Sequence, residues 1–151
     1  MALTTRQTII DAIYALLIAN QGAGTVYAMT GGRIYDTLAA DDPTLPFVVF
    51  TVVDDQLQQY FSVDSIQMDF QVDVYGPRDT SIGGPKACRV IGDAAMALLH
   101  RSAITISGAN GCSILCQSGT QGLDMDYVAG GSTQLDAYRD TRVYRLFGTG
   151  T

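Results

Sequence analysis

An uninterrupted alternation of apolar and polar residues runs from Ile66 to Tyr75, in the order I-Q-M-D-F-Q-V-D-V-Y. Successive side chains of a β-strand point to opposite faces, so the pattern predicts one strand with an apolar face and a polar face. The apolar face holds Ile66, Met68, Phe70, Val72 and Val74, and the polar face holds Gln67, Asp69, Gln71, Asp73 and Tyr75. The sheet is therefore expected to cover a core on one side only. Its polar face has two interpretations, ordinary solvated surface or a contact surface for a partner.

A second apolar run, P-F-V-V-F-T-V-V from Pro46 to Val53, is rich in β-branched and aromatic residues and predicts a central strand. It is followed by the segment D-D-Q-L-Q-Q-Y, Asp54–Tyr60, which we call the polar arm. Because the polar arm joins the central strand to the alternating strand, we expect an antiparallel hairpin with an extended tip. A polar tip of this length is a predicted partner contact, through Asp54, Asp55, Gln56, Gln58, Gln59 and Tyr60.

Two segments carry apolar residues at helical spacing. Between Thr5 and Asn20 the apolar stripe consists of Ile9, Ile10, Ile13, Leu16 and Leu17. After Pro85, which suits a first helical turn, a second stripe consists of Ala87, Val90, Ile91, Ala94, Ala95, Leu98 and Leu99. The sequence therefore predicts two main helices.

Three further strands are expected at Arg33–Tyr35, Cys112–Gln117 and Thr141–Phe147, with a loop of about twenty residues (119–137) between the last two. The predicted fold class is α+β, with an antiparallel-rich mixed sheet of about five strands and two main helices packed on one face. Residues 1–151 fit a single domain, which at this length can fold by its core alone.

The chain is acidic, with 15 Asp and Glu against 9 Lys and Arg, a net charge of −6 and a pI near 4.4. This balance argues against a protein that grips phosphate backbones through a basic patch, and it is compatible with an acidic wall that DNA slides past. No apolar run reaches the roughly 18 residues that a membrane span needs, and the N-terminus lacks the pattern of a signal peptide.

The three cysteines are predicted to be free thiols in a reducing compartment. Cys112 and Cys116 on one strand would lie about 13 Å apart, beyond the reach of a disulfide. Metal binding is the alternative, but the sequence has no C-x-x-C motif and a single histidine, His100. His100 falls at the end of the second helix, where a cation meets the helix dipole favourably, and is interpreted as a structural residue.

No residue pattern assembles a catalytic group. Asp69 and Asp73 would stand about 13 Å apart on one strand, too far for paired acid and base catalysis. Asp124 and Asp126, about 6.6 Å apart if extended, leave open a divalent cation site with Asp136. The competing hypothesis is therefore a small metal-dependent enzyme that uses the carboxylates of the Leu123–Tyr127 loop.

Arginines cluster near the C-terminus at Arg139, Arg142 and Arg145. They suit either partners for acidic neighbours in an assembly or an edge strand kept soluble by charge. One hypothesis is that Asp69 and Asp73 face a neighbouring subunit, whose Arg142 or Arg145 pairs with them.

Five pieces in order along the chain carry a family resemblance. They are the first helix ending near Asn20, G-G-R-I-Y at Gly31–Tyr35, P-F-V-V at Pro46–Val49, V-D-V-Y-G at Val72–Gly76, and the A-x-x-I-x-x-A-x-x-x-L-like second helix. In this order they resemble the tail terminator, or tail completion, proteins of long-tailed phages and related prophages. The long 119–137 segment and Gly83-Gly84-Pro85 depart from the pattern of that family.

The resemblance implies a structural protein of the virion, assembled in the host cytoplasm, without catalysis or cofactor. It implies a homo-oligomeric ring, usually of six subunits, at the head-proximal end of the tail tube. Such a ring stops tube polymerisation and offers a surface to the head-completion, or stopper, proteins, and DNA passes through its lumen without specific binding. Another neck or tail-tube component is the alternative within the same biology.

Overall fold

The computed structural model describes residues 6–39, 44–60, 63–77, 84–106, 109–128 and 134–150. Their elements follow the order α1 (Arg6–Ile18), α2 (Val26–Thr30), β1 (Ile34–Asp36), β2 (Phe47–Tyr60), β3 (Val63–Pro77), α3 (Gly84–Leu99), β4 (Ala109–Val128) and β5 (Gln134–Gly150). The predicted α+β class is confirmed, and so are both main helices and all five strands. The short helix α2 was not predicted, although Thr25 caps its start by accepting a hydrogen bond from the Ala28 amide, at 3.3 Å, on its Oγ1.

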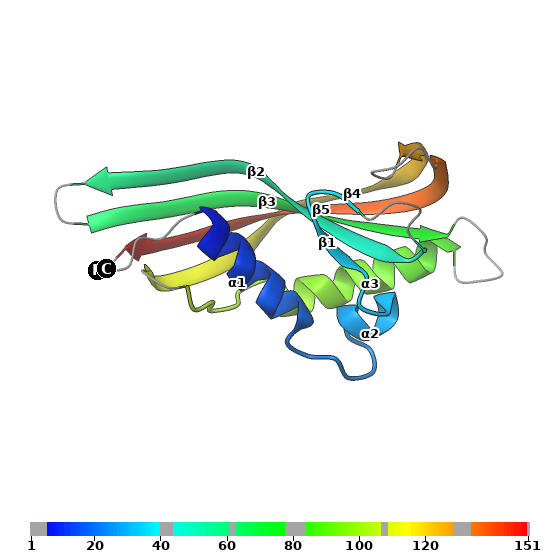
Figure 1. Ribbon diagram of the computed structural model, residues 1–151, viewed down its shortest axis with the longest axis horizontal. Helices are drawn as coiled ribbons and strands as arrows, with labels where there is room; N and C mark the ends of the chain where they lie inside the picture. Colours follow the sequence, from blue (N-terminus) through cyan, green and yellow to red (C-terminus); the bar gives the residue numbers. More distant parts are fainter. Residues whose placement is uncertain are drawn as a thin grey trace.

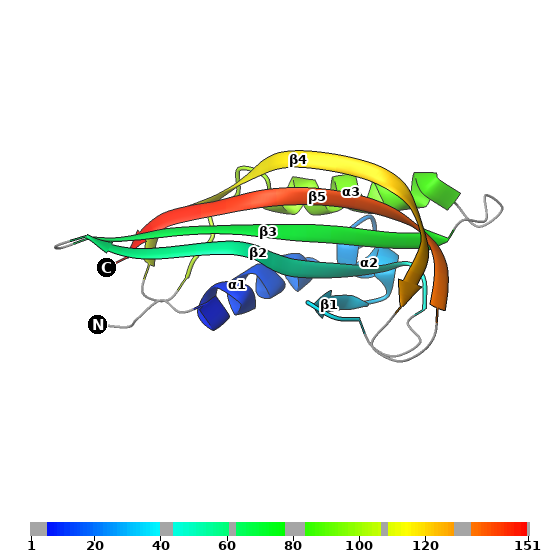
Figure 2. The ribbon, with the colours of Figure 1, turned by 90° about the horizontal axis from the view of Figure 1, so that it is seen from above.

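The five strands form one mixed sheet in the order β1-β2-β3-β5-β4. Only β1 and β2 are parallel, and the other neighbouring pairs are antiparallel. Figure 1 shows the helices gathered on one face of this sheet, and Figure 2 shows β4 along one edge and β1 with β2 along the other. The sheet therefore has a helix-covered inner face and an outer face.

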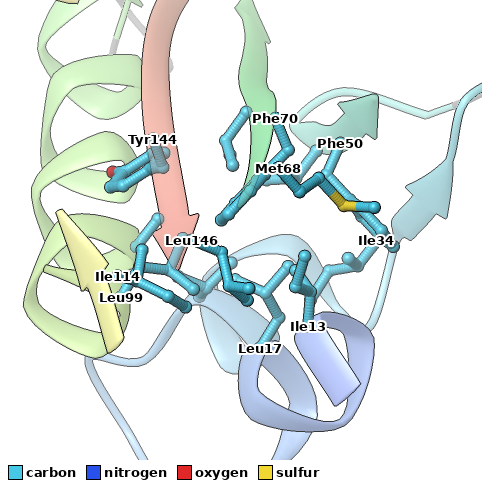
Figure 3. Packing of buried hydrophobic residues seen from close by; sticks show 14 of the residues in the cluster. Ile13, Leu17, Ile34, Phe50, Met68, Phe70, Leu99, Ile114, Tyr144 and Leu146 are labelled. Atoms are coloured by element: carbon cyan, nitrogen blue, oxygen red, sulfur yellow. The ribbon is translucent and has the colours of Figure 1, made fainter. Parts of the chain in front are cut away.

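The main core lies between the inner face and the helices (Figure 3). All five residues predicted for the apolar face of β3 are buried. They pack with the stripe of α1 (Ile9, Ile13, Leu17), the stripe of α3 (Ile91, Ala95, Leu99) and the inner side chains of β5 (Tyr144, Leu146). The rings of Phe70 and Tyr144 stack at a centroid distance of 5.4 Å across the β3–β5 ladder.

The prediction that the other face of β3 is polar along its whole length is wrong at one end. Tyr75 is buried in a second, smaller core on the outer face, where its ring stacks on Phe47 at 4.9 Å. The other members of this cluster are Ala39, Val49 and Ala137. Residues that precede β2 thus cover the outer face here, which a pattern within one strand does not reveal.

Both polar segments that the sequence suggested as loop or hairpin tip belong to long strands. The loop predicted for 119–137 is wrong, because β4 extends to Val128 and pairs with β5 from its first residue, Gln134. The polar arm continues β2 after a register shift between Val52 and Asp54, and it pairs with β3 until Tyr60 stands opposite Val63. The expected antiparallel hairpin is confirmed, and the polar arm is one of its two paired strands. The turn expected at 41–43 lies outside the described residues.

Candidate assembly surface

Asp69 and Arg145 form a two-pronged ion pair on the outer face. The two residues stand directly opposite each other in the β3–β5 ladder. Arg145 donates from Nε to Oδ1 of Asp69 at 2.8 Å and from Nη2 to Oδ2 at 2.9 Å. The hydrogen bonds from Arg145 hold the pKa of Asp69 below its usual value. The side chains are 18% and 41% exposed, so the pair remains accessible.

Asp73, two rungs further along β3, is buried and fully engaged within its own chain. It accepts hydrogen bonds from Thr141 Oγ1 at 2.6 Å and from Gln71 Nε2 at 2.7 Å. These bonds compensate the carboxylate for the water it loses on burial.

Arg142 lies on the inner face, under helix α3. Its Nε donates to Asp140 Oδ1 at 3.0 Å and its Nη2 to Asp93 Oδ1, on α3, at 2.7 Å. Burial opposes the charged form, but the two carboxylates outweigh it and raise the pKa of Arg142. Gly92 makes room for this cluster, because a Cβ there would stand 3.0 Å from Arg142 Nη2. The cluster fastens α3 to β5.

The four residues predicted to meet at a subunit contact are thus divided between two faces. Asp69 and Arg145 lie on the outer face as one pair, whereas Arg142 is engaged on the inner face. Each has a partner within its own chain. A role in a subunit contact stays a proposal, and only the accessible pair offers it directly.

Apolar side chains surround the Asp69–Arg145 pair. Phe147 is 39% exposed, while Leu115 and Val143 are half-buried. The ladder places Leu115 beside Arg145, and Phe147 and Val143 in the rows on either side of the pair. Aromatic residues and arginine are enriched at protein contact surfaces, and this part of the outer face holds both.

The chain itself covers part of each sheet edge. β1 pairs with β2 from Val48 to Phe50, and the Thr37 amide donates to the Phe50 carbonyl at 2.8 Å. At the other edge, the segment after α3 exchanges hydrogen bonds with Ile114, donating from Arg101 N at 2.7 Å and accepting at Ser102 O at 3.2 Å. Sequence reasoning did not predict either partial cover, because both depend on contacts between distant segments.

The side chain of His100 makes the last contact along this covered part of β4. Its Nδ1 accepts a hydrogen bond from the Cys116 amide at 2.9 Å. The histidine is therefore a structural residue that binds the backbone of the edge strand β4. Its position at the end of a helix did not predict this hydrogen bond.

The cysteines and carboxylates of the described residues were the candidates for chemistry. Cys88 donates from Sγ to the Val74 carbonyl at 2.9 Å, and burial raises its pKa to about 12, so it is a poor nucleophile. All three cysteines are free thiols, as predicted. Among the side chains that the structure describes, no group of three or more His, Cys, Asp or Glu is placed to hold a metal ion. The side chains of Asp124, Asp126 and Asp136 lie outside that set. No helix in the described part is long and apolar enough to cross a membrane.

By fold, the molecule belongs to the small α+β proteins whose single sheet is covered by helices on one face. Residues 11–123 match the model of the family described as "Tail completion protein gp17", so the chain belongs to that family. This confirms the resemblance and makes the protein a phage tail structural protein.

The solved structures include a similar chain, described as "Virion of native gene transfer agent (GTA) particle". The likeness covers 93% of each chain with a TM-score of 0.64, and 15% of the aligned residues are identical. At this identity it shows a shared fold. No curated protein sequence matches the chain.

Proposed function

We propose that this protein is a tail terminator. Six copies form a ring at the head-proximal end of the tail tube, stop its polymerisation and present a surface to the head-completion proteins. Family membership over residues 11–123 supports a place in the tail. The observation that carries the ring is the five-stranded sheet, whose two edges are each covered only in part by the segments that the structure describes.

The charge of the chain suits a ring around a DNA channel. A net charge of −6 and a pI near 4.4 disfavour tight binding to phosphates. DNA passing through the lumen would then meet no adhesive surface. The place of action is the virion, at the junction of tail and head, after assembly in the host cytoplasm.

Two contact regions follow from the proposal. The polar arm, Asp54–Tyr60, extends β2 as a hairpin arm with β3, and it reaches the tail tube or the neighbouring subunit. The outer face contributes Asp69 and Arg145, which are accessible and framed by apolar groups. Asp73 and Arg142 stabilise the same sheet through hydrogen bonds within their own chain.

Tail tube polymerisation in vitro tests the function. Adding the protein to elongating tubes should give shorter tubes with a ring at one end in negative-stain images. A matched variant replaces residues 59–64 by Asn-Gly, which joins the hydrogen-bonded pair Gln58 and Ser65 by a two-residue turn. This variant should cap poorly. Tubes of unchanged length in the presence of the folded wild-type protein would refute the function.

A further inference from the structure

Two long stretches of strand edge are open in the part of the chain that the structure describes. On β2 the cover by β1 ends at Phe50, which leaves the outer edge of residues 51–60 unpaired. On β4 the cover ends at Cys116, which leaves residues 117–128 unpaired on the side away from β5. Neither stretch contains a Lys, Arg or Pro of the kind that protects exposed edges. Open edges of this length are templates for another strand.

The two open edges run to opposite ends of the sheet. Thr51, Gln71, Val143 and Ser118 form one row across β2, β3, β5 and β4. From this row the open part of β2 runs toward the β2–β3 hairpin, and the open part of β4 runs toward the β4–β5 hairpin (Figure 2). They are therefore diagonal, and of similar length.

The register identifies the backbone groups that point outward. The Val48 amide donates to the carbonyl of Arg33, the residue before β1, so the backbone groups of Val48 point away from β3. The alternation of backbone direction can then be followed from residue to residue through the β2–β3 ladder and past the register shift at Val53. Beyond this shift, the outward residues of the open β2 edge are Asp55, Leu57 and Gln59. On β4 the Ile114 amide donates outward to the Ser102 carbonyl. Following the alternation through the β4–β5 ladder, the outward residues between the two register shifts of the open β4 edge are Gly119, Gln121 and Leu123.

The strand directions match for pairing between copies. Each of the steps β2 to β3, β3 to β5 and β5 to β4 is antiparallel, so β2 and β4 run in opposite directions. Copies placed side by side, with their helices on the same face, would therefore bring the β4 edge of one against the β2 edge of the next as an antiparallel pair.

We infer that the subunits join by β-strand addition, the open β2 edge of one copy (51–60) pairing with the open β4 edge of the next (117–128). This inference rests on the proposed ring. The contact is head-to-tail, so it closes a ring if the rotation between copies fits. Successive sheets would be offset by about ten residues, or roughly 33 Å, and such an offset tilts the strands as in a closed barrel. The Asp69–Arg145 face then runs continuously from copy to copy.

Proline substitution at outward positions tests the pairing. Proline is tolerated on an edge strand when its nitrogen faces outward, and there it cannot donate to a new partner. The variants are Leu57→Pro for the β2 edge and Gln121→Pro for the β4 edge, with Leu57→Ala and Gln121→Ala as controls at the same positions. Circular dichroism and thermal unfolding establish that each is folded, and native mass spectrometry gives the assembly state.

The expected outcome is specific to a head-to-tail contact. Wild type and both alanine variants form rings, and each proline variant alone is monomeric. An equimolar mixture of the two proline variants forms a heterodimer and nothing larger, because one good β2 edge meets one good β4 edge. Homodimers of Gln121→Pro would show β2–β2 pairing and overturn the inference. Rings formed by both folded proline variants would also overturn it while leaving the proposed ring intact.

Hydrogen exchange of the wild-type protein provides the test if a proline variant fails to fold. The amides of Leu57 and Gln121 should exchange about tenfold more slowly, or slower still, in the ring than in the dilute monomer. Equal rates in ring and monomer would contradict the pairing. A wild-type protein that forms no ring, in solution or on tail tubes, would refute the ring itself, and the pairing with it.

Discussion

Asp69 and Arg145 stand opposite each other on neighbouring strands and are joined by two hydrogen bonds of 2.8 and 2.9 Å. The pair spans β3 and β5 on the outer face and satisfies both carboxylate oxygens from a single guanidinium. The ion pair proposed between subunits therefore exists already within one chain. Its two-pronged geometry fixes the orientation of both side chains on the outer face.

The first prediction concerns the pH dependence of this pair. Arg145→Gln should lower the free energy of unfolding at pH 7 by less than about 1 kcal/mol, because both groups are partly exposed. Since the pKa of Asp69 is lowered in the folded protein, the pair stabilises above the ordinary Asp pKa of about 3.9, and this stabilisation is lost as the pH falls through the lower folded value. Urea unfolding of the wild type and the variant, at neutral pH and at acidic pH values below about 3.9, measures the difference in their free energies of unfolding. A difference that does not shrink in acid would contradict the assignment.

The second prediction separates the two carboxylates that hold Arg142. Asp140 is 1% exposed and Asp93 is 67% exposed. Asp140→Ala should destabilise the fold by about 3 kcal/mol, because it removes one partner of a largely buried charge. Asp93→Ala, the matched control, should cost less than about 1 kcal/mol. Denaturant unfolding measures both, and equal effects would show that the buried bond carries no special weight.

The third prediction tests the close approach of α3 to β5. In Gly92→Ala, the new Cβ would stand 3.0 Å from both Arg142 Nη2 and Asp140 Oδ1. The variant should be destabilised although alanine favours a helix by about 1 kcal/mol, because the ion pair must shift. Ala97→Gly, on the exposed side of the same helix, calibrates that propensity. Thermal unfolding compares the two, and a more stable Gly92→Ala variant would show that the cluster adapts without loss.

The fourth prediction concerns thiol reactivity. Burial raises the pKa of Cys88 to about 12 and also raises that of Cys112. At pH 8 both should react with iodoacetamide only after unfolding, whereas half-buried Cys116 should react faster in the folded protein. Peptide mass spectrometry of a labelling time course identifies each site. Rapid labelling of Cys88 in the folded protein would contradict its buried position.

The fifth prediction is that salt strengthens the subunit contact. Each open edge carries two aspartates and no basic residue, Asp54 and Asp55 on β2 and Asp124 and Asp126 on β4. When two such edges pair, their aspartates repel each other. Salt weakens this repulsion, because the Debye length falls to about 10 Å at 0.1 M. Sedimentation velocity from low to moderate salt should show a growing ring fraction. A ring that dissociates as salt rises would instead indicate a contact built on opposite charges.

The sequence alone predicted the elements whose pattern is local. The alternation from Ile66 to Val74 predicted a strand with a buried face, and the stripes in α1 and α3 predicted the two helices over it. The five ordered pieces also led to the family. These signals are readable because strand and helix periods place a residue by its neighbours in sequence.

Only the tertiary structure decided where these elements meet. Tyr75 has the parity of a surface residue but is buried, because residues before β2 cover that end of the sheet. Ladder pairing, which no local propensity records, turned the polar segments around Gln56 and Gly122 into strand. It also brought Asp69 beside Arg145, 76 residues away in the chain. Strand partners and edge covers are long-range relations, and the fold sets them by choosing which strands lie side by side.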